Sequence, residues 1–134
     1  MTIRAVADTH AVIWYVFADE HISLTARTIM QDAAKADEQI AMSSITLVEI
    51  VYLIEKRRID VHTLDRILEA LDHPQSLFVE IPVDRRISES IRLVDRAQVP
   101  DLPDRIIAAT AVHLGVPLIS RDGKIRSSSV PTIW

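Results

Sequence analysis

Near its start the chain reads Ile3-Arg4-Ala5-Val6-Ala7-Asp8, a mostly apolar run of strand length that ends in an acidic residue. The apolar segment Ala11–Phe17 follows almost at once. Because aspartate is a favoured residue just before a helix, this stretch predicts a strand that runs directly into a helix. Units of this kind build mostly parallel sheets.

Short apolar runs recur along the chain between longer segments with helical spacing. The other strand candidates are Gln39–Met42, Leu77–Ile81, Pro117–Ser120 and Pro131–Trp134. Strands that alternate with helices favour parallel pairing, with helices on both faces of the sheet. We therefore predict an α/β fold with a mostly parallel central sheet of about four or five strands.

The helix candidates are bounded by residues that commonly begin or end helices. Serine and aspartate are frequent N-caps, and glycine is a frequent terminator. Regularly spaced leucine and isoleucine mark the helices that lack such signals. The expected helices run from Ser23 to about Ala36, from Ser44 to about Arg57, over 64–71, over 87–94, and from Asp101 to Gly115.

Length and composition indicate one globular domain spanning residues 1–134. The chain is 49% apolar and 25% charged, contains no cysteine and has no signal-peptide layout or membrane-spanning stretch. We expect a cytoplasmic protein. The net charge of −4 argues against a protein that simply coats nucleic acid, although 12 of its 15 basic residues are arginine, a bidentate phosphate donor.

Four acidic residues lie beside apolar runs, where solvated surface acids are least expected: Asp8, Glu49, Asp104 and Asp122. An ionised carboxylate next to a core is costly unless it is paired, hydrogen-bonded or bound to a metal. Ligands of parallel sheets bind beyond the carboxyl ends of the strands, and the predicted elements can bring all four acids to that edge. We therefore expect one acidic pocket that only folding assembles.

Each acid also has an ordinary structural interpretation. Asp8, Asp101 and Asp104 stand at expected helix starts, where a carboxylate caps the helix or complements its dipole. Asp122-Gly123 is a common turn dipeptide. The helix around Glu49 is so apolar that we expect it to be buried on nearly every side. A core ion pair with an arginine would then satisfy Glu49.

The combination of acids favours a metal site. Magnesium prefers oxygen ligands and keeps several waters, and bound divalent ions activate water and stabilise the leaving oxygen of a phosphodiester. Without metal, close carboxylates would repel one another and some of their pKa values would rise. We therefore predict phosphodiester hydrolysis that requires Mg²⁺ or Mn²⁺.

Four segments resemble, in the right order and spacing, those of the PIN-domain nucleases, specifically the VapC toxins of VapBC type II toxin–antitoxin pairs. They are Val6–Trp14 with its Asp-Thr-His motif, Ser43–Ile50, Asp101–Ala111 and Pro117–Asp122. The match runs nearly end to end. Its two departures, Arg4 in the first strand and a proline at 103 instead of one place earlier, touch no expected ligand.

The resemblance implies a three-layer PIN-like fold and an endoribonuclease dependent on Mg²⁺ or Mn²⁺. Its substrate would be structured RNA, commonly tRNA, so that cleavage arrests translation. A cognate VapB-type antitoxin, toxin homodimers and toxin–antitoxin hetero-oligomers are implied as well. The implied metal ligands are Asp8, Glu49, Asp104 and Asp122, supported by Ser120, Asp101 and Thr9.

Other residues have two interpretations each. Arg105, Arg121 and Lys124 flank the expected ligands and are candidates for RNA phosphate contacts, with ordinary ion pairs as the alternative. Trp14 and Tyr15 have side chains that can stack on a base, although core packing of the first helix is favoured. The Leu47–Leu71 region is a candidate antitoxin groove or dimer face, and plain core packing explains most of the same residues.

Two non-catalytic classes compete with the nuclease hypothesis. A receiver-like regulatory domain would need a lysine on a late strand and acids near the first strands. No suitable lysine is present, and Glu49 lies inside a predicted helix. A degenerate PIN scaffold would only bind RNA or protein, but it would have no reason to bury so much negative charge.

Overall fold

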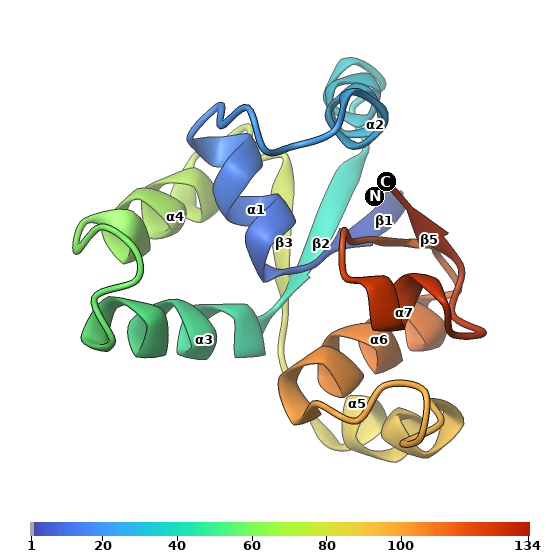
Figure 1. Cartoon of the computed structure of the whole chain (residues 1–134). Coiled ribbons are helices and arrows are strands. Elements are labelled where there is room, and N and C mark those ends of the chain that lie inside the picture. Colours follow the sequence, from blue (N-terminus) through green and yellow to red (C-terminus); the bar gives the residue numbers. More distant parts are fainter. Residues whose placement is uncertain (1) are drawn as a thin grey trace.

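The computed structural model describes residues 2–134, and its strands alternate with helices (Figure 1). The strands are β1 (Ile3–Ala7), β2 (Gln39–Ser43), β3 (Phe78–Ile81), β4 (Leu118–Ile119) and β5 (Thr132–Ile133). The helices are α1 (Thr9–Val16), α2 (Leu24–Lys35), α3 (Ser44–Glu55), α4 (Thr63–Asp72), α5 (Arg85–Ser90), α6 (Leu102–Leu114) and α7 (Gly123–Arg126), with a 3₁₀ turn η1 at Ile91–Leu93.

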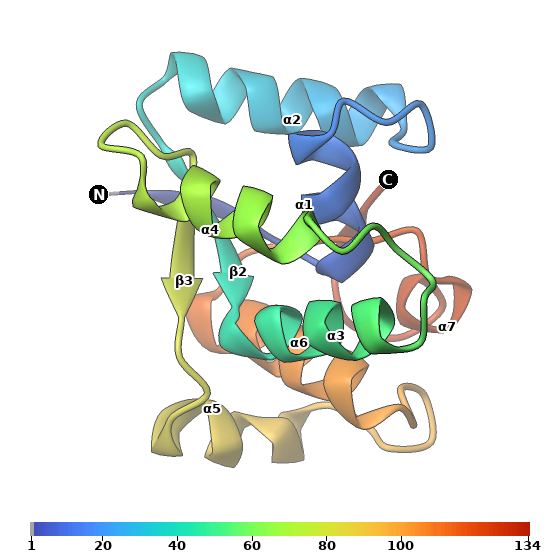
Figure 2. The same cartoon turned by 90° about the vertical axis from the view of Figure 1, so that its left-hand side faces the viewer.

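The five strands form one parallel sheet in the order β3-β2-β1-β4-β5. Helices α1, α2 and α4 cover one face of the sheet, and α5, α6 and α7 lie on the other (Figures 1 and 2). Helix α3 leaves the end of β2 and contacts α1, α4 and α6. The predicted α/β fold with a parallel sheet between helical layers is confirmed.

The strand order places a crevice at the centre of the sheet. From β1 the chain adds β2 and β3 on one side, and later adds β4 and β5 on the other. The connections that leave β1 and β4 therefore run in opposite directions away from the centre of the sheet. Parallel sheets open a crevice at such a point, beyond the carboxyl ends of the strands. Asp8 directly follows β1, and Asp122 lies shortly after β4.

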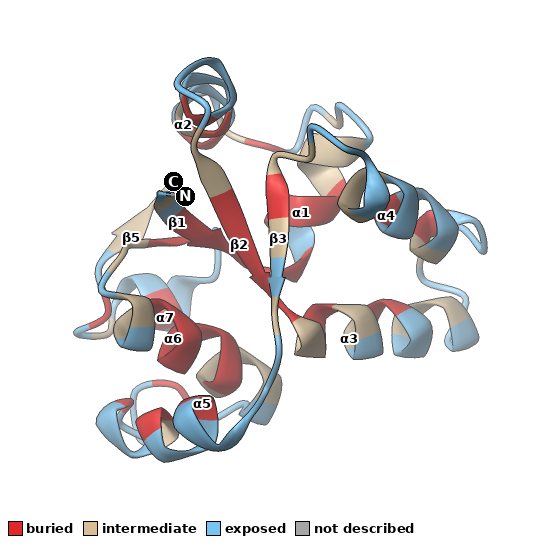
Figure 3. Ribbon diagram, turned by 180° about the vertical axis from the view of Figure 1, so that it is seen from behind, coloured by how far each residue is buried: buried red, intermediate tan, exposed pale blue. Residues whose placement is uncertain are grey.

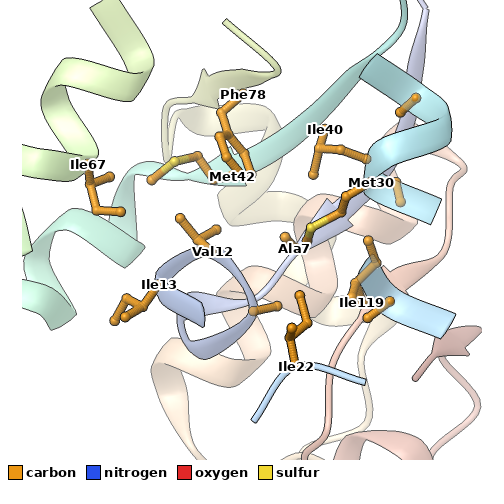
Figure 4. Packing of buried hydrophobic residues seen from close by; sticks show 14 of the residues in the cluster. Ala7, Val12, Ile13, Ile22, Met30, Ile40, Met42, Ile67, Phe78 and Ile119 are labelled. Carbon is orange, nitrogen blue, oxygen red and sulfur yellow. The ribbon is translucent and has the colours of Figure 1, made fainter. Parts of the chain in front are cut away.

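Two buried clusters fill the spaces between the sheet and its helical layers. Alternate residues of β1 point to opposite faces, so that Ala5 and Ala7 belong to one cluster and Val6 to the other. Figure 4 shows the first cluster, in which Met30 of α2 lies close to Ile40 of β2. Most of β1 and β2 and the inner face of α6 are buried, β5 is intermediate, and the outer helix faces are exposed (Figure 3).

Local sequence signals set several helix ends. The Ser23 hydroxyl accepts a hydrogen bond from the amide of Ala26 at 3.0 Å and begins α2 as predicted. Helix α6 ends at Gly115, whose φ of +68° lies in the left-handed region that favours glycine. None of the helices in the described part of the chain is both long enough and apolar enough to cross a membrane.

Two predicted helix boundaries are wrong. Ser43, not Ser44, is the N-cap of α3, because its hydroxyl oxygen accepts a hydrogen bond from the backbone amide nitrogen of Ile45 at 3.2 Å. The Ser44 hydroxyl instead accepts the amide of Val83 at 3.1 Å and fixes the chain after β3. The helix expected over 87–94 stops at Ser90 and tightens into η1. Helical spacing continues through η1, but the hydrogen bonding changes.

The expectation that α3 is buried on nearly every side is also wrong. Thr46 and Ile50 are buried, but Val48 and Tyr52 are each 60% exposed. Neighbouring helices cover α3 only in part, so its outer side faces solvent despite its apolar sequence. Apolar composition alone does not determine how many elements pack against a helix.

Candidate functional site

A cleft of about 840 Å³ lies at the carboxyl ends of β1 and β4. The four acids that the sequence singles out all line it, although they come from four separate segments of the chain. Asp101, Thr9, Arg121 and Lys124 line it too. The acids thus meet in one cleft, at the crevice that the strand order creates.

Asp8 is held at the bottom of this cleft by its position between β1 and α1. It is 9% exposed, and its Oδ1 accepts the amide of Ala11 at 2.9 Å as the N-cap of α1. Burial raises the pKa of Asp8, the Ser120 hydroxyl and the Ala11 amide oppose this rise, and Asp122 adds to it. Asp8 therefore both caps a helix and contributes charge to the cleft.

Glu49 is oriented by a short chain of hydroxyl groups. The Thr9 hydroxyl donates to Glu49 Oε1 at 2.6 Å and lies 3.0 Å from the Thr46 hydroxyl. Because Thr9 has one hydroxyl proton, Thr46 must donate to Thr9 when Thr9 donates to Glu49. Burial raises the pKa of Glu49, and the hydrogen bond from Thr9 lowers it. No ion pair to an arginine satisfies Glu49 among residues 2–134.

Asp101 and Asp104 stand in the first turn of α6. The Oδ2 of Asp101 accepts the amide of Asp104 at 3.1 Å, and Pro103 occupies the early helical position that tolerates proline. Asp104 itself is half-buried. Burial, and after it the negative charge of Asp101, Asp122, Glu49 and Asp8, together raise its pKa to about 7.

Asp122 begins the short helix α7. Its Oδ1 accepts hydrogen bonds from the backbone amides of Lys124 at 2.9 Å and Ile125 at 3.0 Å. Its own backbone amide donates a hydrogen bond to the Ser120 hydroxyl at 3.0 Å. Ser120 is fully buried at the end of β4. The Asp122-Gly123 pair thus forms a helix start in place of the turn that the dipeptide suggested.

The charge of the cleft is not balanced by the protein. None of the ion pairs found within residues 2–134 involves Asp8, Glu49, Asp101, Asp104 or Asp122. In that same range no three carboxylate or imidazole side chains stand close enough to form a preformed metal site. The donor set nevertheless fits a hard divalent cation, because every acidic ligand offers carboxylate oxygen. Such an ion would also relieve the repulsion that raises the pKa of Asp104.

Comparison with known families matches the PIN domain over residues 5–129. The chain belongs to the PIN-domain family. This membership and the observed α/β fold confirm the family resemblance that the four sequence segments indicated.

Proteins similar to this PIN domain include a named ribonuclease and chains of toxin–antitoxin complexes. The protein named Ribonuclease VapC22 of Mycobacterium tuberculosis (strain ATCC 25618 / H37Rv) is 23% identical over 132 aligned residues, and the match covers 95% of this chain and 95% of that one. A toxin–antitoxin complex from Klebsiella pneumoniae contains a chain with 28% identity and a TM-score of 0.60, covering 92% of this chain and 91% of that one. VapBC2 from Rickettsia felis, bound to a DNA fragment from its promoter, gives a TM-score of 0.68 at 16% identity, with 95% and 96% covered.

Of the three basic residues proposed to contact RNA, two line the cleft of this PIN domain and one does not. Arg121 and Lys124 line the cleft. Arg105 does not, because its guanidinium donates to the carbonyl of Val94 at 2.9 and 3.2 Å and to that of Ile91 at 3.1 Å. These bonds tie α6 to η1. We therefore remove Arg105 from the candidate RNA contacts.

Sequence reasoning did not place His10 in the cleft, and for Trp14 it favoured core packing over base stacking, yet both residues line the cleft. Both lie on α1, and their spacing of four residues places them on the same side of that helix. Trp14 was assigned to the core, and it does pack partly against it. Counting helical turns from the N-cap Asp8 would have predicted that this side of α1 borders the acids.

Proposed function

We propose that this PIN domain is an endoribonuclease that requires Mg²⁺ or Mn²⁺ and acts as the toxin of a type II toxin–antitoxin pair. The observation that carries the proposal is the gathering of five carboxylates in one cleft with no ion-pair partner within the described chain. A binding module for RNA gains nothing from such a cluster, because uncompensated carboxylates repel phosphate. A nuclease gains a place for its metal.

The residues have separate parts in the proposed mechanism. Asp8, Glu49, Asp104 and Asp122 would hold the ion, and the hydroxyl of Thr9 fixes the direction of Glu49. A bound Mg²⁺ or Mn²⁺ supplies an activated water and neutralises charge on the phosphodiester. The Ser120 hydroxyl accepts a hydrogen bond from the amide of Asp122, and the Asp101 carboxylate accepts one from the amide of Asp104. Ser120 and Asp101 would therefore act by positioning these two acids.

The first experiment measures RNA cleavage by the purified chain. Labelled tRNA is incubated with the protein in Mg²⁺, in Mn²⁺ and in EDTA. We expect cleavage with either metal and none in EDTA. Asp104→Asn should remove cleavage while keeping the circular dichroism spectrum of the parent. Equal cleavage by this variant, or cleavage that survives EDTA, would overturn the metal-dependent mechanism.

We further propose that cleavage of tRNA or another structured RNA in the cytoplasm inhibits translation, and that a VapB-type antitoxin neutralises it. The naming of similar proteins as toxin–antitoxin complexes supports this partner. Exposed apolar side chains on α3 and α4, such as Val48, Tyr52 and Leu68, keep the Leu47–Leu71 region as a candidate face for the antitoxin or for a toxin homodimer.

Expression in bacteria tests the toxin role directly. Induction of the parent chain should arrest growth, whereas Asp104→Asn should not. Sequencing RNA 5′ ends after induction would identify the cut RNA. Normal growth with active, cleavage-competent protein would reject the toxin role and leave the nuclease proposal standing. A homodimer would be detected by light scattering of the purified chain.

A further inference from the structure

The lining of the cleft also contains aromatic and basic residues. His10, Trp14, Arg121 and Lys124 line it. Arg121 and Lys124 are the arginine and lysine of the lining, and they flank the acid Asp122 at the start of α7. The proposed metal ligands provide no surface that recognises a nucleobase. The aromatic and basic residues of the lining are therefore the groups that can recognise an RNA base.

The side chain of Trp14 is the centre of an aromatic cluster. The ring of His21 stacks on it at a centroid distance of 5.4 Å, with 25° between the planes. His10 and Trp134 approach it in tilted geometry at 5.3 and 5.9 Å. His21 is held in turn by Asp19, at 2.6 Å. Trp14 thus contacts a ring on its own helix, a ring in the segment after that helix, and the distant ring of Trp134.

Arg121 lies over the Trp14 ring with its Cζ 4.7 Å from the ring centroid. Five carboxylates line the same cleft, yet no ion pair of Arg121 occurs in residues 2–134. The guanidinium is instead placed by a cation–π contact. Because Arg121 is exposed, one side of its guanidinium remains open to the cleft.

A guanidinium supported by an aromatic ring is suited to one kind of ligand in RNA. Bases stack on arginine planes and on aromatic rings, but only when they are unpaired and splayed out, since helical stacking covers the faces of paired bases. A phosphate contact would not require the Trp14 ring beneath the arginine. The Trp14–Arg121 pair is therefore better suited to a base than to the backbone.

We propose that the Trp14–Arg121 pair is a stacking site for an unpaired base next to the cleaved phosphate. The inference rests on the proposed nuclease function of the same cleft. Trp14 lies six residues beyond Asp8, about 9 Å along α1 at the helical rise of about 1.5 Å per residue. The site would therefore select single-stranded segments, such as loops, over duplex RNA.

The test compares two probes that differ only in their bases. One is a short single-stranded RNA, and the other carries abasic sites at its central positions. Binding is measured by fluorescence anisotropy in Ca²⁺, with probe integrity checked on a gel. We expect the parent chain to prefer the base-bearing probe about tenfold, within the range of about 5- to 150-fold found for single stacked bases. A duplex of the same sequence should bind no better than the abasic probe.

Two variants separate stacking from charge. Arg121→Lys keeps the charge but loses the planar guanidinium, so it should bind both probes with nearly equal affinity. Lys124→Met removes a charge from the same cleft and should weaken both probes by the same factor, leaving the preference intact. Trp14→Phe, checked for folding by circular dichroism, should reduce the preference without removing it.

Each possible result decides the proposal. Equal binding of the two probes by the parent chain, a preference kept in Arg121→Lys, or no measurable binding of either probe would overturn it. The base preference does not depend on cleavage. A parent chain that discriminates between the probes but cuts no RNA would therefore refute the nuclease function and support the stacking site. A parent chain that cuts RNA but binds both probes equally would refute the stacking site and support the nuclease function.

Discussion

Asp8 and Asp84 begin their helices with the same hydrogen bond, yet only Asp8 belongs to the cleft. Asp8 Oδ1 accepts the amide of Ala11 at 2.9 Å, and Asp84 Oδ1 accepts that of Ile87 at 3.1 Å. Asp84 is exposed before α5 and does not line the cleft. Local sequence is enough to form a helix cap. The strand order decides whether the charge of that cap joins other acids.

The largest predicted effect comes from changing both caps in the same way. Asparagine caps helices about as well as aspartate, so Asp8→Asn and Asp84→Asn should both fold. We expect Asp8→Asn to lower RNA cleavage by more than about 100-fold, since even residues behind metal ligands cost about 10–100-fold. Asp84→Asn should stay within about twofold of the parent. Similar rates of tRNA cleavage by Asp8→Asn and Asp84→Asn would contradict the conclusion that only Asp8 belongs to the functional cleft.

A second prediction concerns the support of Glu49. Thr9→Val keeps the shape of the side chain but removes the hydroxyl that donates to Glu49. We expect the metal concentration needed for half-maximal cleavage to rise by about 10–100-fold. The matched control is Thr110→Val, which removes a fully buried hydroxyl that bonds within α6 to the carbonyl of Ile106. An unchanged metal requirement in Thr9→Val would show that Glu49 needs no such support.

The third prediction is a pH dependence of stability. The pKa of Asp104 is raised from 3.8 to about 7 by burial and by neighbouring acids, so the unfolded chain loses this proton at lower pH than the folded chain. Metal-free protein should therefore lose stability as the pH rises from about 4 to about 7. Because Asp104 is partly solvated, we expect a fall in Tm of about 4 °C, or roughly 1 kcal/mol, between pH 5 and pH 8 in EDTA.

Two controls belong to the pH measurement. Asp104→Asn should reduce the dependence, because the amide does not titrate, and the raised pKa values of Asp8 and Glu49 account for what remains. Mn²⁺ should raise Tm more at pH 8 than at pH 5, since an ion competes with the proton for the carboxylate. Scanning calorimetry of both proteins measures the two effects. A parent and a variant with identical slopes would contradict a raised pKa at Asp104.

The smallest predicted effect belongs to the cap outside the cleft. Asp84→Ala removes the hydrogen bond to the amide of Ile87. Helix α5 is short and Asp84 is exposed, so we expect a loss of about 0.5 kcal/mol in unfolding free energy, near the lower limit for such caps. Urea denaturation measures this loss, and RNA cleavage should be unchanged. Reduced cleavage would mean that α5 affects the site.

Most of the fold was predictable because its signals are local. The strand at Ile3–Ala7 and the helix end at Gly115 match the expected boundaries, since apolar runs and a left-handed glycine act within a few residues. The exposure of α3 could not be predicted, because it depends on how many helices surround it. The N-cap of α3 was missed by one residue, because Ser43 and Ser44 have the same chemistry and only the path of the chain distinguishes them.

The site was predictable in part for the same reason. The acids could be found because each lies next to an apolar run, and parallel strands end at a common edge. The roles of Arg105 and Trp14 depend on contacts that no local pattern contains: a guanidinium bound to carbonyls of η1, and a ring beneath Arg121. The assignment of ligand roles to the acids stays a prediction.

Three acids of the cleft also accept hydrogen bonds from backbone amides, which has a practical consequence for spectroscopy. The carboxylates of Asp8, Asp101 and Asp122 receive hydrogen bonds from backbone amides. Any cation or phosphate that approaches the carboxylates must polarise those amides as well. In a ¹⁵N-labelled sample, the amide resonances to follow during a titration are therefore those of Ala11, Asp104, Lys124 and Ile125.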